Sequence, residues 1–264
     1  CQPFYLIMED NMEVGVNLFS LRTLLSDEKG VFETFENLKD MGVSYTQFSG
    51  AKYDVDMLVK ASEILPIVLT HVSYDRIVGD IDALIEEHKR FGCYNIGLGG
   101  FVIDALFDKE KCISTIDALE KAAVKCLENG MKLTHHHHSL EFKKLFGDKT
   151  VFDMILERAP HLNITIDTYW LQHGGVDVCD YIKKIGPRCE CIHLKDYVIA
   201  GKTYEELKPA FERVGYGNMD FHSIVKTAKE SGIKYFLIEQ DDACEKENPL
   251  GQIGDSVNYC RMEL

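Results

Sequence analysis

The chain has 264 residues, of which 45% are hydrophobic, and this is enough apolar material to bury one large core. Its 43 acidic and 29 basic residues give a formal net charge of −14, and the scattered lysines and arginines form no basic stripe, which disfavours a nucleic-acid partner. No apolar run approaches the ~18 residues of a membrane span, and no signal-peptide pattern opens the chain, so we expect a cytoplasmic protein with no membrane partner. The nine cysteines lack a disulfide-framework spacing, and we expect their thiols to be reduced.

Strand and helix patterns alternate along the whole chain. Apolar runs predict eight strands, at residues 14–18, 43–48, 67–71, 94–98, 131–136, 162–167, 189–194 and 234–239. Amphipathic or capped segments predict the helices, at residues 27–40, 54–64, 75–91, 109–129, 150–158, 176–185, 220–231 and 256–261.

Eight strand–helix units in series, with no Pro/Ser-rich linker between them, predict a single (β/α)8 TIM barrel that spans residues 12–264. Residues 1–11 carry no recognisable element and are expected to be an N-terminal extension of unknown role. An open Rossmann-like sheet is the weaker alternative, because no G-x-G-x-x-G follows the first strand.

Four of the predicted strands close on a histidine or an acid. These strand-end residues are His136, Asp167, His193 and Glu239. A single acid at such a place is usually only a helix cap, but period-2 alternation turns all four toward the barrel interior at the carboxyl ends of the strands. Histidine and carboxylate donors suit Mn²⁺, Co²⁺, Zn²⁺ or Mg²⁺. The sequence therefore predicts a divalent-metal site with these four ligands.

His136 belongs to a run of four histidines, His135–His138. A register that points His136 inward also points His138 inward, and it turns His135 and His137 the other way. His138 is therefore a candidate ligand or proton-transfer group. The alternative is a solvated loop that chelates metal incidentally.

Five sequence blocks, taken together and in order, resemble one known group of enzymes. The blocks are THHHHSLEF at 134–142, IDTYWLQHGGVD at 166–177, IHLKD at 192–196, VGYGNMD at 214–220 and IEQD at 238–241. The chain resembles the sugar phosphate isomerase/epimerase superfamily, the xylose isomerase-like TIM barrels, from about residue 12 to residue 259. The resemblance places Asp167, His193 and Glu239 on metal-ligand positions, and His136 where the ligand is often a glutamate.

The resemblance implies a divalent cation bound to adjacent oxygens of a sugar or cyclitol, with a carbon-bound proton moved through an enediolate. The implied activity is that of an isomerase or epimerase. The same chemistry serves a lyase, either inosose dehydratase-like or C-glycoside-cleaving, and a non-catalytic sugar-binding barrel is a further alternative. An endonuclease IV-type enzyme would need more ligands and a basic groove. Self-association into a homo-oligomer is compatible with the sequence.

Two departures from the family pattern leave the substrate open. His137 stands where the subgroup has asparagine, and Gln47 stands at the second strand end where some members have an acid.

Other polar residues near the strand ends are candidates for the reaction. Glu239 could accept a proton on one face of the sugar, and His138 or Glu141 on the other. Lys195 points inward and could stabilise an oxyanion, or it could pair structurally with an acid.

Three residues are candidates for binding the substrate. His71 could bind a hydroxyl or simply end its strand. Trp170 could stack on a sugar or pack under a loop, and Arg22 could contact a phosphate. Gly215-Tyr-Gly217 resembles an anion-binding turn, but ordinary turn geometry explains it equally well.

Overall fold

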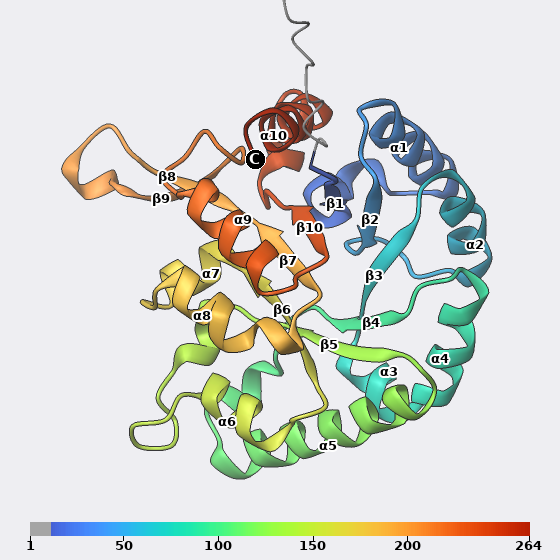
Figure 1. Cartoon of the computed structure of the whole chain (residues 1–264), viewed down its shortest axis with the longest axis vertical. Helices are drawn as coiled ribbons and strands as arrows, with labels where there is room; N and C mark the ends of the chain where they lie inside the picture. Colours follow the sequence, from blue (N-terminus) through green and yellow to red (C-terminus); the bar gives the residue numbers. More distant parts are fainter. Residues whose placement is uncertain (1–11) are drawn as a thin grey trace, which may run out of the picture.

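Eight parallel strands close into a barrel in the computed structural model, which describes residues 12–264 (Figure 1). The expected extension at 1–11 lies outside the described residues. Each strand pairs with its neighbours in the order β1-β10-β7-β6-β5-β4-β3-β2, and β1 also pairs with β2. The strands are β1 (Gly15–Asn17), β2 (Tyr45–Phe48), β3 (Ile67–Val72), β4 (Asn95–Leu98), β5 (Lys132–His136), β6 (Asn163–Asp167), β7 (Cys191–Leu194) and β10 (Tyr235–Ile238). The predicted TIM barrel is confirmed.

Helices surround the barrel on its outside (Figure 1). They are α1 (Glu28–Asp40), α2 (Val55–Ile64), α3 (Tyr74–Gly79), α4 (Ile81–Arg90), α5 (Lys109–Glu128), α6 (Val151–Arg158), α7 (Thr168–His173), α8 (Val178–Ile185), α9 (Phe221–Glu230) and α10 (Pro249–Glu263). Short 3-10 helices lie in the connections, at Leu18–Leu24, Ile103–Leu106, Ser139–Phe142, Gly186–Arg188, Tyr204–Glu206 and Ala243–Glu245. Within the described part of the chain, no helix is long and apolar enough to cross a membrane.

The segment predicted as one helix over 75–91 is two helices, which corrects the prediction. Asp80 leaves the helical conformation at φ −153° and ψ 62°, and its carboxylate accepts a hydrogen bond from Ala83 N at 3.2 Å. An aspartate that caps a helix in this way competes with a continuous helix, although the apolar spacing on either side is uninterrupted. The last helix also begins earlier than predicted, because Asn248 caps it and Pro249 occupies its first turn.

An antiparallel hairpin after β7 was not predicted. It consists of β8 (Asp196–Ala200) and β9 (Lys208–Glu212), and it projects from the barrel beside α9 (Figure 1). Its strands are mostly half-buried or exposed, so they lack the apolar run by which the barrel strands are recognised.

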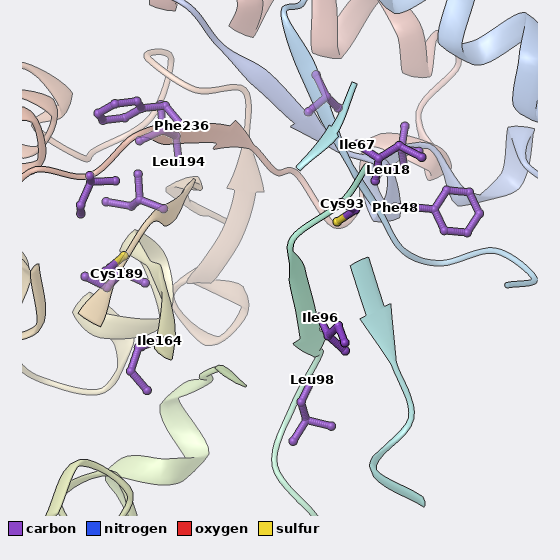
Figure 2. Close-up of a cluster of buried hydrophobic side chains, with 14 of the residues drawn as sticks. Leu18, Phe48, Ile67, Cys93, Ile96, Leu98, Ile164, Cys189, Leu194 and Phe236 are labelled. Carbon is purple, nitrogen blue, oxygen red and sulfur yellow. The ribbon is translucent and has the colours of Figure 1, made fainter. Parts of the chain in front are cut away.

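Alternation along the strands divides the core into two layers. Apolar side chains such as Ile96, Ile164 and Phe236 pack between the strands and the helices (Figure 2). A smaller cluster fills the barrel itself, with Tyr45, Leu69, Cys191 and Leu237 as its buried members. The Tyr45 hydroxyl accepts a hydrogen bond from Phe236 N at 3.0 Å and donates to Glu13 O at 3.1 Å. The interior is therefore a packed core and not an open pore.

Candidate metal centre and adjoining cavity

The four predicted ligands meet at the carboxyl ends of four consecutive barrel strands. His136 ends β5, Asp167 ends β6, His193 lies on β7 and Glu239 directly follows β10. One ligand atom from each lies within 4.8 Å of those of the others, and all four side chains are buried. The strand register explains this convergence, because Asp167 is the pairing partner of His193 in the neighbouring strand.

The distances within the cluster are short. Asp167 Oδ2 lies 3.4 Å from His136 Nε2 and 3.8 Å from His193 Nδ1. His193 Nδ1 and Glu239 Oε2 form an ion pair at 2.8 Å, although their geometry is not that of a hydrogen bond. Two imidazoles with two carboxylates are a common donor set for a divalent cation. The residues present therefore fit a divalent metal ion.

The charges in the cluster favour ionised carboxylates. Burial alone would raise the pKa of Asp167 and of Glu239, but the Lys195 ammonium and the neighbouring histidines hold both pKa values well below their usual range. Burial lowers the pKa of His193, but the two carboxylates outweigh it and raise that pKa to about 9. The acids are thus ready to bind a cation, and a bound cation would compete with the proton on His193.

Side chains from β1 and β2 orient two of the four candidate ligands. Asn17 Nδ2 donates to Glu239 Oε1 at 2.8 Å, and the Ser49 hydroxyl donates to Asn17 Oδ1. His193 Nε2 donates to Gln47 Oε1 at 2.6 Å, which leaves His193 Nδ1 facing the cluster. Hydrogen bonds of this kind fix the tautomer and direction of a metal ligand. Sequence reasoning missed Asn17, although it is a polar residue at a strand end like the four ligands.

Two backbone hydrogen bonds hold Asp167. Its Oδ1 accepts from Trp170 N at 2.9 Å and so caps α7, while its own N–H donates to His137 Nε2 at 3.2 Å. His137 faces away from the cluster, as predicted, and packs against Phe152 with ring centroids 5.1 Å apart. It nevertheless supports the site, because it fixes the backbone from which Asp167 projects.

Lys195 lies beside the cluster with three carboxylates around its ammonium group. Nζ is 2.8 Å from Asp241 Oδ1, 3.6 Å from Asp167 Oδ2 and 3.7 Å from Glu239 Oε2. Burial opposes the charge on this group, but the carboxylates outweigh it and raise its pKa. The rings of Trp170 and Phe211 each approach Nζ, with centroids at 5.0 Å. The structural pairing considered for Lys195 is therefore present, and sequence reasoning missed Asp241 as its partner.

A cavity of about 240 Å³ adjoins the cluster. Lys195, Asp241, His71 and His138 line it together with His136 and Glu239. Gln47 Nε2 donates to His71 Nε2 at 2.9 Å, and the His138 ring lies 4.7 Å from that of His136. Burial and the neighbouring histidines lower the pKa of His71 well below its usual value, and that of His138 to about 4. Both rings are therefore neutral at pH 7.

The structure places three other candidates outside this cavity. Arg22 Nη1 donates to the backbone oxygens of Phe19 at 3.0 Å and Asp241 at 2.7 Å, so it holds the loop that carries Asp241. Glu141 is 1% exposed, and its carboxylate accepts from His138 N at 3.0 Å. Trp170 contacts the His138 ring at 5.3 Å between centroids.

The glycine turn before α9 already holds a carboxylate of this chain. Asp196 Oδ2 accepts hydrogen bonds from Gly215 N at 3.0 Å and Gly217 N at 2.9 Å, and Oδ1 accepts from Met219 N at 3.1 Å. A Cβ at Gly217 would lie 2.3 Å from Asp196 Oδ1, so a residue with a side chain would collide with this carboxylate. The resemblance to an anion-binding turn is thus real, and the anion is Asp196.

Solved structures share this fold over nearly the whole chain. A sugar phosphate isomerase/epimerase from Parabacteroides distasonis superposes with a TM-score of 0.74 at 17% identity, covering 97% of this chain and 96% of that one. A xylose isomerase-like TIM barrel protein from Mycobacterium smegmatis, in complex with magnesium, gives 0.70 at 14%, covering 94% and 95%. The IOLI protein with a zinc atom also gives 0.70 at 14%, covering 96% and 100%.

Such low identities establish the fold alone. No curated protein matches the chain significantly. The sequence model of the xylose isomerase-like TIM barrels, however, matches residues 70–261, which is well over half of the chain. The chain therefore belongs to the xylose isomerase-like TIM barrel family.

Proposed function

We propose that this protein is a divalent-metal-dependent isomerase or epimerase that acts on a sugar or cyclitol by moving a carbon-bound proton through an enediolate. The observation that carries the proposal is the convergence of His136, Asp167, His193 and Glu239 beside a polar cavity. A divalent ion held by these four residues would polarise a carbonyl and stabilise the developing negative charge on its oxygen. We assign the metal-ligand role to all four on this basis.

The proton-transfer groups are proposed to be Glu239 and His138. Both line the cavity, and they approach it from β10 and from the end of β5, with β6 and β7 between these strands. Two basic groups on separate walls can serve opposite faces of one substrate carbon, which epimerisation requires. Glu141 holds the His138 backbone and does not line this cavity, so we propose that it positions His138.

The other candidate residues are proposed to bind the substrate, to balance the charge of the carboxylates or to hold neighbouring groups in place. His71 offers a neutral ring nitrogen to a substrate hydroxyl, and Lys195 balances the three carboxylates around it. Trp170 and Arg22 are proposed to act indirectly, Trp170 by packing on His138 and Arg22 by holding the Asp241 loop.

A metal-replete screen of keto-sugars and inososes in D₂O, followed by NMR, tests the proposal. Solvent deuterium on a substrate carbon supports the isomerase or epimerase. Loss of water or of an aglycone identifies a lyase instead, and binding without any turnover identifies a sugar-binding barrel. Elemental analysis of untagged protein should find one divalent ion per chain. Absence of metal, with no thermal shift on adding Mn²⁺, Co²⁺ or Zn²⁺, would contradict the proposed site.

A further inference from the structure

A second cavity of about 230 Å³ lies next to the polar one and has a different chemical character. Its lining includes Phe101 and Leu106, which are buried, and Ile103 and Leu140, which are 58% and 53% exposed. The 3-10 helices that follow β4 and β5 supply three of these four side chains, so the cavity opens on the same rim as the metal cluster. Glu141 also lines it, but its carboxylate is turned to the His138 N–H and to His135.

The two cavities meet at His138. The His138 side chain lines both of them, and the consecutive glycines Gly99 and Gly100 line the first and the second respectively. A Cβ at Gly100 would lie 3.2 Å from His138 Cε1, so this glycine leaves the ring in contact with both spaces. A ligand that fills the polar cavity therefore has apolar space immediately beyond one of its proposed proton-transfer groups.

The sizes of the cavities suggest that one ligand uses both. Small-molecule sites usually measure roughly 300–1,000 Å³. Each cavity alone is smaller than that, at about 240 and 230 Å³, but together they fall within the range. An apolar cavity of about 150 Å³ is enough for a benzene ring. The second cavity therefore has room for one ring.

We propose that the second cavity binds an apolar, ring-sized substituent of the substrate, so that the substrate class is a sugar or cyclitol carrying an aryl or similar group. This inference rests on the proposed function for the polar half of the ligand. Exposed Ile103 and Leu140 at the rim would be covered by the substituent, which accounts for two exposed apolar side chains beside the polar cavity.

The first test uses 4-fluorophenol as a probe, with binding followed by ¹⁹F NMR on metal-replete and on EDTA-treated protein. The matched variants are Leu140→Asp at the rim and Leu127→Asp on α5, an equally exposed leucine that lines neither cavity. The probe should bind the parent protein and Leu127→Asp with or without metal, and Leu140→Asp at least about tenfold more weakly. Ile103→Asp is the second rim variant should Leu140→Asp be poorly folded.

The second test compares methyl and phenyl glycosides of glucose, galactose, mannose and xylose on metal-replete protein. At least one phenyl glycoside should bind about tenfold or more tightly than its methyl partner, and Leu140→Asp should abolish the gain. The inference is overturned if 4-fluorophenol does not bind, if both leucine variants weaken it equally, or if no phenyl glycoside outbinds its partner, including the case in which neither binds.

Two further outcomes separate the inference from its alternatives. If the protein is a dimer that Leu140→Asp converts to a monomer, a second copy covers the apolar rim and the inference fails. If the protein binds no metal but still binds 4-fluorophenol and discriminates the phenyl glycosides, the metal-dependent function fails while the apolar site stands.

Discussion

The histidine buried beneath β3 should make the stability of this protein fall steeply in mild acid. His88 is fully buried on α4, where Thr70 Oγ1 donates to its Nε2 at 2.7 Å and its Nδ1–H donates to Leu84 O at 2.7 Å. The neutral ring therefore has partners for both of its nitrogens, and the main cost of charging it is the burial of the charge. Burial lowers the pKa of His88 to about 4, and the nearby Arg76 adds to this effect.

The sign and size of the effect follow from linkage. The unfolded chain, with a histidine pKa of about 6.5, binds a proton between pH 6.5 and pH 4 that the folded chain excludes. Stability from this group is therefore complete above pH 6.5 and is lost as the pH falls toward 4. The shift corresponds to about 2 kcal/mol between pH 7 and pH 5, and about 3 kcal/mol between pH 7 and pH 4.

Urea unfolding at pH 7, 6 and 5, with EDTA present, measures this contribution as a difference between variants. His88→Gln is expected to be less stable than the parent at every pH because its packing differs. Between pH 7 and pH 5, however, the decrease in the free energy of unfolding should be about 2 kcal/mol smaller for this variant than for the parent. His222→Gln, at an exposed position on α9, is the control and should leave the slope almost unchanged. Parallel pH profiles for the parent and His88→Gln would refute the reasoning.

Three further predictions concern the candidate metal centre. Glu239→Gln keeps the shape but removes the charge and basicity, so turnover in the D₂O assay should fall by ~10² to 10⁴ while the fold survives; unchanged turnover with lowered stability would make Glu239 a structural acid. Asn17→Ala removes the hydrogen bond to Glu239 and should weaken metal affinity by about 10- to 100-fold in a metal titration, and an unaltered affinity would exclude this orienting role. Adding Mn²⁺, Co²⁺ or Zn²⁺ at 100 times its Kd should raise the free energy of unfolding by about 2.7 kcal/mol in the parent but far less in Asp167→Asn. An equal rise in both proteins would place the ion elsewhere.

The barrel and the convergence of the four candidate ligands were predictable because both depend on short-range patterns. A strand has a side-chain period of two, so the positions of the outward-facing apolar residues decide which strand-end side chains point inward at the rim. Parallel pairing then brings the strand ends together without further information. Asp167 and His193 illustrate this, since they are direct neighbours in the sheet although 26 positions apart in the sequence.

Contacts set by tertiary structure were not predictable in the same way. Asp241 reaches Lys195 from the loop after β10, and the course of that loop depends on Arg22, whose guanidinium binds the Asp241 backbone across 219 positions. The break at Asp80 depends on one side chain that competes with a helical hydrogen bond, and the apolar spacing on both sides does not predict it. The support that His137 gives to Asp167 comes from a residue facing the helices, where the pattern predicts only packing.

The turn that Asp196 fills has a consequence for ligand selection at the rim. Three backbone amides, of Gly215, Gly217 and Met219, point at one carboxylate that is covalently attached to the same chain. A tethered group competes at a high effective concentration, and an outside anion would have to displace it and leave a charge without partners. The turn between β9 and α9 is therefore unable to bind a phosphate while Asp196 occupies it, and its three amides hold the start of β8 in place.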